Sequence, residues 1–325
     1  MLNNMDPLTD ILHEMRLSGG VFLDAELTAP WCINSQVAPE DCSPFMPLPR
    51  QVIAYHYVME GTLLMQIAGE GPVPACPGDI LIMPRNHAHL LGSELQISPL
   101  DAGALIETGQ GDHVGRIRAG GGGVPTRLFC GYLGCDDPSH PLLHSLPPAI
   151  KLTLSDTASA SWIEGSIGYA MRQLQSDDTG ASNSLARIAE LLFSEAVRTY
   201  ANQLPETEGN WLGGLRDRHV ARALALIHTR LSDTWTLDQL AADVGLARSA
   251  LADRFVRHIG MSPIRYVSHR RLVRAADQLT FGHDPISDIA YAAGYASESA
   301  FHRAFKRAFD IGPAAFRKAK QMATR

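Results

Sequence analysis

Cysteine is scarce in this sequence, and the few copies are not paired. The 325 residues include five, at Cys32, Cys42, Cys76, Cys130 and Cys135, and no two of them stand at CxxC spacing. An odd number without such pairs is the pattern neither of a disulfide framework nor of a structural zinc site. We therefore expect reduced thiols.

Long hydrophobic runs are also missing. No uninterrupted apolar stretch reaches about 18 residues, the length at which a run is a candidate for crossing a bilayer. The segment Met1–Arg16 carries Asp6, Asp10 and Glu14, where a secretory signal would be basic and then apolar. The sequence therefore predicts a protein without a membrane segment that stays in the cytoplasm.

Positive charge is sparse in the first two thirds of the chain and concentrated in the last third. Residues 213–325 hold 18 Lys and Arg against 10 Asp and Glu, a balance of +8. Within the overall charge of −6, this leaves 10 against 24, or −14, for residues 1–212. A basic terminal third is typical of a nucleic-acid-binding module attached to another domain.

The rest of the composition indicates a globular protein with more than one unit. A hydrophobic content of 45% is enough for two or three packed cores in a chain of this length. Short apolar runs bounded by Gly and Pro predict strands at Val52–Val58, Leu63–Ile67, Ile80–Met83 and Thr126–Leu133. The stretch Ala119–Gly123, four glycines after an alanine, predicts a flexible connection.

Two helices are predicted after the strands. Apolar residues recur every three or four positions over 161–175 and 184–200, which gives each helix one apolar stripe. The stripes include Trp162, Ile163 and Ile167 in the first helix and Leu192 and Ala196 in the second. Such a pair packs either on the strands or on a second subunit. Residues 202–214 have no periodicity and are interpreted as a linker to the terminal domain.

The terminal third contains an internal duplication. Residues 237–263 read LDQLAADVGLARSALADRFVRHIGMSP, and residues 286–313 read ISDIAYAAGYASESAFHRAFKRAFDIGP. With one residue of slack after the glycine, every matched position is apolar, Gly or Pro. The matches are Leu240 with Ile289, Ala241 with Ala290, Gly245 with Gly294, Leu251 with Phe301, Phe255 with Phe305, and Pro263 with Pro313.

Each copy has the features of a helix-turn-helix unit. A small residue, Ala241 or Ala290, lets a second helix cross close by, and Gly245 or Gly294 supplies the positive φ of a tight turn. The second helix buries its apolar pair and leaves its other face free to enter the major groove of DNA. The free positions are Arg248, Ser249, Ala252 and Asp253 in the first unit, and Glu298, Ser299, His302 and Arg303 in the second.

The second unit is better equipped to read bases. Arg303 can donate two hydrogen bonds to guanine, and Glu298 can accept one from cytosine. His302 and Ser299 can reach base or phosphate. In the first unit an alanine and an aspartate stand where a long donor would be useful, so we expect the second unit to make more of the direct base contacts.

A helix predicted over Ile264–Leu279 joins the two units. Its inward side holds Tyr266, Leu272 and Ala275, and four arginines line it, at Arg265, Arg270, Arg271 and Arg274. Some of these arginines are expected to contact phosphate and others to pair with surface carboxylates. We assign Arg271, together with Lys306 of the second unit, to DNA binding.

The region from about Arg218 to Lys318 resembles the DNA-binding domain of the AraC/XylS family, on the run from Ile289 to Lys306 and on Pro313. The resemblance implies two recognition helices in adjacent major-groove segments of double-stranded promoter DNA. It also implies activation, the family's commoner habit, with RNA polymerase as partner. The family's base-reading slots fall on Ser249, Ala252 and Asp253 in the first unit and on Glu298, Ser299, His302 and Arg303 in the second, and Asp253 departs from the commoner basic or amide residue. The alternative is a pair of helical hairpins without a nucleic-acid role.

The first half resembles a cupin. Residues 48–61 and 77–89 match the two strand motifs of a cupin barrel, with Gly61 and Gly78-Asp79 at hairpin turns. Residues 5–154 are similar to the cupin-type sensor found on one subgroup of the same regulators.

The sequence as a whole predicts an α+β multidomain protein. Its three parts are a cupin-like β-barrel sensor at 1–155, a helical linker or dimerisation segment at 156–212, and an all-α domain with two helix-turn-helix motifs at 213–325.

Catalytic cupins hold a metal with an HxH pair and a carboxylate from the first motif and a His from the second. Here His89 matches the second motif, but the HxH positions of the first hold nothing suitable and His56 stands near its end. We therefore predict no metal, no cofactor and no enzymatic activity. His56, His87 and His89 either line an effector pocket or are ordinary hydrogen-bonded or exposed histidines.

Cys130 and Cys135 are five positions apart, and proximity at a strand end would allow a thiol switch. The resemblance implies a response to oxidants or electrophiles for some members of the subgroup. A reactive thiol needs nearby positive charge, which only Arg127 supplies in the local sequence. Buried, inert thiols are the alternative.

Two hypotheses for function follow. In the first, the protein is a one-component regulator in which a small molecule or oxidant sensed by residues 1–150 changes the geometry of a homodimer or releases the terminal domain. In the second, a cupin enzyme carries a basic appendage.

Overall fold

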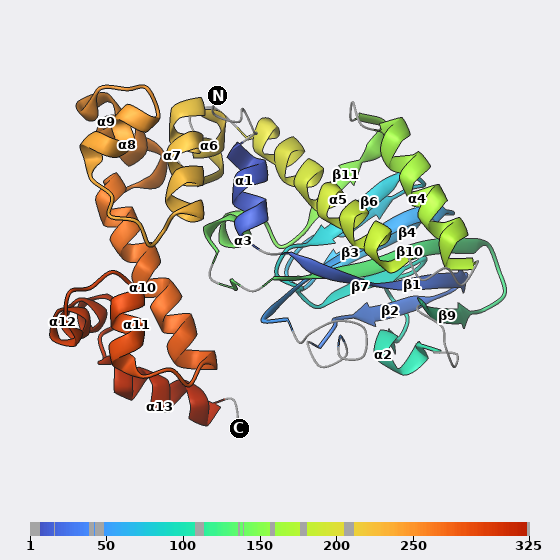
Figure 1. Ribbon diagram of the computed structural model, residues 1–325. Coiled ribbons are helices and arrows are strands. Elements are labelled where there is room, and N and C mark those ends of the chain that lie inside the picture. The colour runs from blue at the N-terminus through green and yellow to red at the C-terminus, as the bar shows by residue number, and fades with distance from the viewer. Residues whose placement is uncertain are drawn as a thin grey trace. The chain divides into compact units, whose positions relative to one another are not determined.

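The computed structural model describes residues 7–15, 17–38, 42, 49–107, 114–135, 137–138, 140–156, 160–175, 181–204 and 211–323 (Figure 1). The chain divides into two compact units. The β unit comprises residues 15–138 and 146–203, and the helical unit comprises residues 1–14, 139–145 and 204–325. The domain limits at 155 and 212 stay a prediction.

The β unit contains two sheets. The six-stranded sheet has the order β11 (Ile150–Thr153), β6 (Asp79–Met83), β3 (Gln51–Glu60), β10 (Pro125–Cys135), β1 (Ser18–Thr28), β9 (Val114–Gly120). The five-stranded sheet has the order β5 (Val73–Ala75), β4 (Leu63–Ile67), β7 (His89–Gly92), β2 (Cys32–Ser35), β8 (Leu100–Asp101). The predicted β-rich fold is confirmed, but the described strands form two separate sheets and not a closed barrel.

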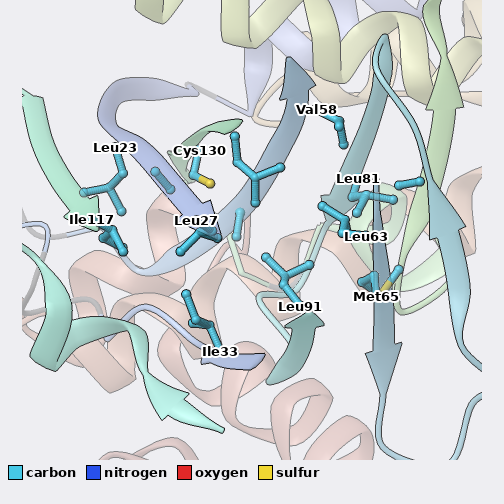
Figure 2. Packing of buried hydrophobic residues seen from close by; sticks show 14 of the residues in the cluster. Leu23, Leu27, Ile33, Val58, Leu63, Met65, Leu81, Leu91, Ile117 and Cys130 are labelled. Atoms are coloured by element: carbon cyan, nitrogen blue, oxygen red, sulfur yellow. The ribbon is translucent and has the colours of Figure 1, made fainter. Parts of the chain in front are cut away.

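One hydrophobic core takes a face from each sheet. Side chains alternate across a strand, so Ala54 and Val58 of β3 point to the same side, as do Leu63 and Met65 of β4. These residues form one buried cluster with residues of β1, β2, β6, β7, β9 and β10 (Figure 2). The four apolar runs predicted as strands all lie within strands, because each supplies inward-facing residues to this core.

Two helices, α4 (Ala160–Gln175) and α5 (Ala181–Gln203), complete the β unit as predicted. They pack on each other, and α5 also contacts β1, β10 and β11, so it covers the six-stranded sheet. Ile163, Ile167, Leu192 and Ala196 are buried, whereas Trp162 is 56% exposed and does not belong to the packed stripe. No described helix is long and apolar enough to cross a membrane.

The glycine-rich stretch at the end of β9 is an ordered turn, so the prediction of a flexible connection is wrong. Gly121 donates from its backbone N to O of Thr28 over 2.9 Å, and Gly123 donates to O of Ala29 over 2.8 Å. A Cβ on Gly120 would lie 1.8 Å from O of Thr28, and one on Gly123 would lie 2.6 Å from O of Ala29. Glycine is required here because two backbones approach closely.

The helical unit holds ten helices in its described part. They are α1 (Pro7–Glu14), α3 (Pro141–Ser145), α6 (Trp211–Arg216), α7 (Arg218–Thr229), α8 (Leu237–Asp243), α9 (Arg248–Ile259), α10 (Pro263–Phe281), α11 (Ile286–Ala292), α12 (Glu298–Phe309) and α13 (Pro313–Ala323). Of the predicted linker, residues 205–210 lie outside the described residues. Residues 211–214 belong to α6 and are buried, because Trp211 packs in the helical core and not in a solvated linker.

A buried polar chain ties α3 into the helical unit. The backbone N of Leu142 donates to Nδ1 of His140, so Nε2 of His140 carries the hydrogen and donates to Nδ1 of His228 over 3.2 Å. His228 then donates from Nε2 to the hydroxyl of Tyr266 over 2.8 Å, and Nε1 of Trp211 donates to the same oxygen over 2.9 Å. Burial lowers the pKa of His140 well below its usual value, with His228 and Arg270 adding to the effect. His140 is therefore neutral in this chain.

Candidate DNA-binding interface and sensor core

The first helix-turn-helix unit is built from α8 and α9. Thr236 and Gln239 form a capping box at the start of α8, and Gly245 has φ of 71° in the turn that follows. Helix α9 buries Leu251 and Phe255 completely. The predicted tight turn and apolar pair are confirmed.

The face of α9 opposite this pair meets solvent. Arg248, Ser249 and Asp253 are exposed and Ala252 is half-buried. Nη1 of Arg248 lies 3.5 Å from a carboxylate oxygen of Asp238 on α8, and both side chains are exposed. An exposed pair of this length holds the guanidinium only weakly. Arg248 can therefore turn toward a phosphate or a base.

The second unit is built from α11 and α12 in the same way. Gly294 has φ of 79°, and the Ser297 side chain caps α12 by accepting from the backbone N of Ala300 over 3.2 Å. Phe301 and Phe305 are completely buried. The opposite face exposes all four predicted base-reading residues, Glu298, Ser299, His302 and Arg303.

His302 is exposed but not unconstrained. A Cβ on Gly312 would lie 2.6 Å from Nε2 of His302, so the imidazole rests against the turn before α13. Arg303 follows His302 on the same exposed face, and Lys306 is exposed one turn further on. Arg303 therefore presents an exposed guanidinium in the first half of α12, the part of a recognition helix that reads bases.

The arginines of α10 are placed in three different ways. Arg265 and Arg274 are exposed and available to phosphate. Arg270 is 4% exposed, so the expectation that it lines the surface is wrong. It lies four residues after Tyr266, on the same buried helix face, and this spacing was the signal that could have shown it. Arg271 is half-buried and donates to two backbone carbonyls.

In the β unit, three of the predicted sensor residues meet in the core. Sγ of Cys130 on β10 lies 2.8 Å from Nδ1 of His56 on β3, and the two residues face each other in the strand register. Nε2 of His56 lies 2.8 Å from Nε2 of His89 on β7, in the other sheet. This hydrogen-bonded chain therefore joins the two sheets through the apolar core between them.

The end of the chain, taken with a neutral His89, fixes the position of every proton. Nδ1 of His89 lies 2.8 Å from the carbonyl O of His87, which can only accept. A neutral His89 that donates from Nδ1 accepts at Nε2, so His56 donates to it and accepts at Nδ1, and the thiol of Cys130 donates. In the state with both imidazoles and the thiol neutral, every bond of the chain is made.

The electrostatics favour the same neutral state. Burial lowers the pKa of His56 well below its usual value, and His89 lowers it further. Burial also lowers the pKa of His89, against the opposite effect of its bond to the His87 carbonyl. Burial raises the pKa of the Cys130 thiol, and Asp24 raises it further. A thiolate at Cys130 is therefore disfavoured.

The side chains of the remaining sensor candidates, His87 and Cys135, are not part of this chain. His87 is half-buried, and its Nδ1 is buried without a hydrogen-bond partner. Cys135 is buried and donates to O of Asp137 and O of Met15 over 3.5 and 3.6 Å. Cys130 and Cys135 lie in one strand five positions apart, which places them on opposite faces and, at about 3.3 Å per residue, roughly 16 Å apart. The expectation that they lie near each other is therefore wrong.

Over the described residues, no group of three His, Cys, Asp or Glu side chains is arranged to hold a metal ion. His56 bonds to Cys130 with one ring nitrogen and to His89 with the other, so the three cannot point at one centre in this arrangement.

The thiol hydrogen bond can be tested through stability. Replacing Cys130 with alanine leaves Nδ1 of His56 buried without a donor, and we expect a loss of about 1–3 kcal/mol in the free energy of unfolding. Cys130→Ser keeps a donor and should lose less. Cys76→Ala, at an exposed cysteine, is the control in urea unfolding. Equal stability of Cys130→Ala and Cys76→Ala would contradict the bond.

Comparison with protein families matches both parts of the chain. A cupin family model matches residues 6–202, more than half of the chain, and a helix-turn-helix domain model matches residues 240–319. The chain belongs to the cupin-bearing regulators of the AraC/XylS family. This regulator thus has its family's DNA-binding domain in the helical unit, which carries the two exposed helix faces described above.

Named relatives extend over nearly the whole regulator. It is 28% identical over 315 residues to an AraC-like transcription regulator of Streptomyces antibioticus, covering 97% of this chain and 99% of the relative. It is 26% identical over 318 residues to the HTH-type transcriptional regulator AlkR of Acinetobacter baylyi, covering 97% and 99%. The DNA-binding domain of AdpA, solved with a target DNA, is 24% identical, with 33% of this chain and 96% of that chain covered and a TM-score of 0.32.

Proposed function

We propose that this regulator activates transcription in response to a small molecule or an oxidant that is sensed in the core of its cupin domain. The observation that carries the proposal is the buried chain of Cys130, His56 and His89. Burying two neutral imidazoles and a thiol in an apolar core costs folding free energy unless each of their hydrogen bonds is made. A ligand or an oxidised sulfur that breaks one bond would therefore change the packing of both sheets, and because the folded core disfavours the thiolate, oxidation of Cys130 requires the core to open first.

Chain connectivity offers a route from this core to the DNA-binding helices. Strand β10 carries Cys130 and ends at Cys135, and His140 and α3, a few residues further along the chain, belong to the helical unit. His140 is fully buried there and bonds to His228. A shift of β10 would therefore be passed along the chain to His140, which is bonded to α7 of the helical unit.

At the DNA, we propose that α12 supplies most of the base contacts and α9 fewer. The exposed face of α12 begins with Glu298 and Ser299 and continues to His302 and Arg303. The corresponding face of α9 presents Asp253, whose charge opposes an approach to phosphate. Lys306, Arg265 and Arg274 are exposed and suited to phosphate contacts.

The base-reading role of Arg303 has a direct test. Arg303→Ala should weaken binding to the DNA duplex that the full chain selects from a random pool by about 1–3 kcal/mol, and should relax one base preference. Arg307→Ala removes an equal charge from the last turn of the same helix, and should change affinity without changing base preference. Both are measured by gel shift against single-base variants of the duplex. Unchanged affinity and preference in Arg303→Ala would contradict the assignment.

The sensing and activating roles are tested together by transcription in vitro. RNA polymerase, the full chain and a template with the selected site are assayed with candidate small molecules, with hydrogen peroxide and without addition. We expect one class to raise transcription, and Cys130→Ala or His56→Gln to abolish that response. Sedimentation of the same samples tests the proposed homodimer. Stoichiometric iron in the purified chain without any DNA affinity would favour a cupin enzyme instead.

A further inference from the structure

The two helix-turn-helix units have separate cores on one shared helix. In the first half of α10, Tyr266 packs edge-on against Phe255 of α9, with ring centroids 5.6 Å apart. In the second half, Leu272 and Leu279 join the buried cluster of α11 and α12. Figure 1 shows α10 running from the group α7–α9 to the group α11–α13. Because a single helix can curve, α10 does not by itself fix the angle between the two helix-turn-helix units.

Arg271 lies at the middle of α10 and contacts both units. Its Nε donates to O of Leu231 over 2.8 Å, and its Nη2 donates to O of Asp233 over 2.5 Å. These carbonyls belong to the turn between α7 and α8, just before the first unit. The guanidinium also rests against the turn of the second unit, because a Cβ on Gly294 would lie 2.8 Å from Nη1.

The turn that Arg271 binds has side-chain contacts of its own. Arg230 forms an ion pair with Asp233 at 2.7 Å, and its guanidinium stacks over Trp235 at 5.0 Å from the ring centroid. Nε1 of Trp235 donates back to O of Arg230 over 3.0 Å. Thr236 then caps α8. A bond to this turn therefore positions the start of the first helix-turn-helix unit.

We propose that Arg271 is the positioning residue that sets the relative orientation of the two recognition helices. The planar guanidinium of Arg271 donates to two carbonyl oxygens of one turn in a fixed geometry. The ammonium of a lysine, on a flexible aliphatic chain, cannot reproduce this geometry. The bonds leave a small cavity of about 80 Å³ beside it, lined among others by Ser232, Arg274 and Gln278. This positioning role differs from the phosphate contact that the sequence predicts for Arg271. It rests on the proposed function, in which both helix-turn-helix units bind one DNA duplex.

The test compares the spacing preference of variants on DNA. The selected duplex is altered by inserting or deleting one base pair between its two half-sites, which rotates one half-site against the other by about 35°. The unaltered chain should lose about tenfold or more in affinity on either altered duplex. Arg271→Met should bind the selected duplex about tenfold more weakly and show a much smaller penalty for altered spacing. Arg271→Lys should fall closer to Arg271→Met than to the unaltered chain.

Two controls separate positioning from loss of charge or loss of fold. Arg274→Met removes an exposed arginine that lines the same cavity, and should keep the spacing preference. Gly294→Ala and Gly245→Ala both place alanine at positive φ, but nothing lies within 4 Å of a Cβ at Gly245. Only Gly294→Ala should weaken the spacing preference, and it should add nothing on top of Arg271→Met.

The outcomes are distinct. If Arg271→Met weakens all spacings and each isolated half-site equally, and lowers the slope of log affinity against log salt by about one, Arg271 contacts phosphate and the inference is overturned. If Arg271→Met and Arg274→Met behave alike, it is overturned as well. If the full chain selects no duplex at all, the result contradicts the proposed DNA binding by the two helix-turn-helix units and not the positioning role of Arg271.

Discussion

Replacing Phe305 with alanine should unfold the second helix-turn-helix unit and abolish specific DNA binding. The ring of Phe305 is completely buried, with ring centroids of Phe301, Phe309 and Phe316 at 5.4, 4.5 and 5.3 Å. Removal of a buried phenylalanine costs about 3–5 kcal/mol, through the transfer free energy and the cavity that remains. The core of this unit is small, so a loss of this size removes a large share of its stability.

The measurement resolves the two units from each other. Amide hydrogen exchange over 286–313 should show loss of protection in Phe305→Ala, while protection over 237–263 changes less, because the two cores sit on different halves of α10. Lys306→Ala changes the exposed neighbour of Phe305 and should leave exchange unchanged. Full protection of 286–313 in Phe305→Ala would contradict the packing described for this core.

Acidification should destabilise the β unit. The pKa values of His56 and His89 are lowered in the folded state, chiefly by burial. The unfolded chain takes up a proton on each imidazole as the pH falls through about 6.5, but the folded unit does so only at lower pH. The free energy of unfolding is therefore constant above about 6.5 and falls below it, by up to about 1.4 kcal/mol per pH unit for each histidine.

Hydrogen exchange of β3, β7 and β10 between pH 7.5 and 5.5, corrected for the intrinsic rate, measures this loss. His56→Gln cannot take up the proton and should flatten the dependence, even if its stability at pH 7.5 is lower. His283→Gln, at an exposed histidine of the helical unit, should leave the dependence as it is. A protection that stays constant down to pH 5.5 would mean that the folded core already holds a charged imidazole.

Local features of the sequence were enough for the two helix-turn-helix units. The duplication, the two glycines with positive φ and the apolar pairs of α9 and α12 all act within about twenty residues, so periodicity and turn chemistry reveal them. The same holds for the strands β3, β4, β6 and β10, whose apolar runs supply the core. The opposite faces of Cys130 and Cys135 were also predictable, because an odd spacing within one strand reverses the side.

Tertiary structure alone decided which side chains meet. His56 bonds to residues 33 and 74 positions away in the sequence, because strand register across two sheets brings them together. The separation of the strands into two sheets depends equally on non-local pairing. Likewise, the local sequence around an arginine on α10 does not indicate whether its side chain binds DNA phosphate or another part of the protein. Arg271 differs from the exposed arginines of α10 because the turn at Leu231–Asp233 places two carbonyl oxygens beside its guanidinium. The turn lies about forty residues earlier in the sequence, so only tertiary packing brings the two together.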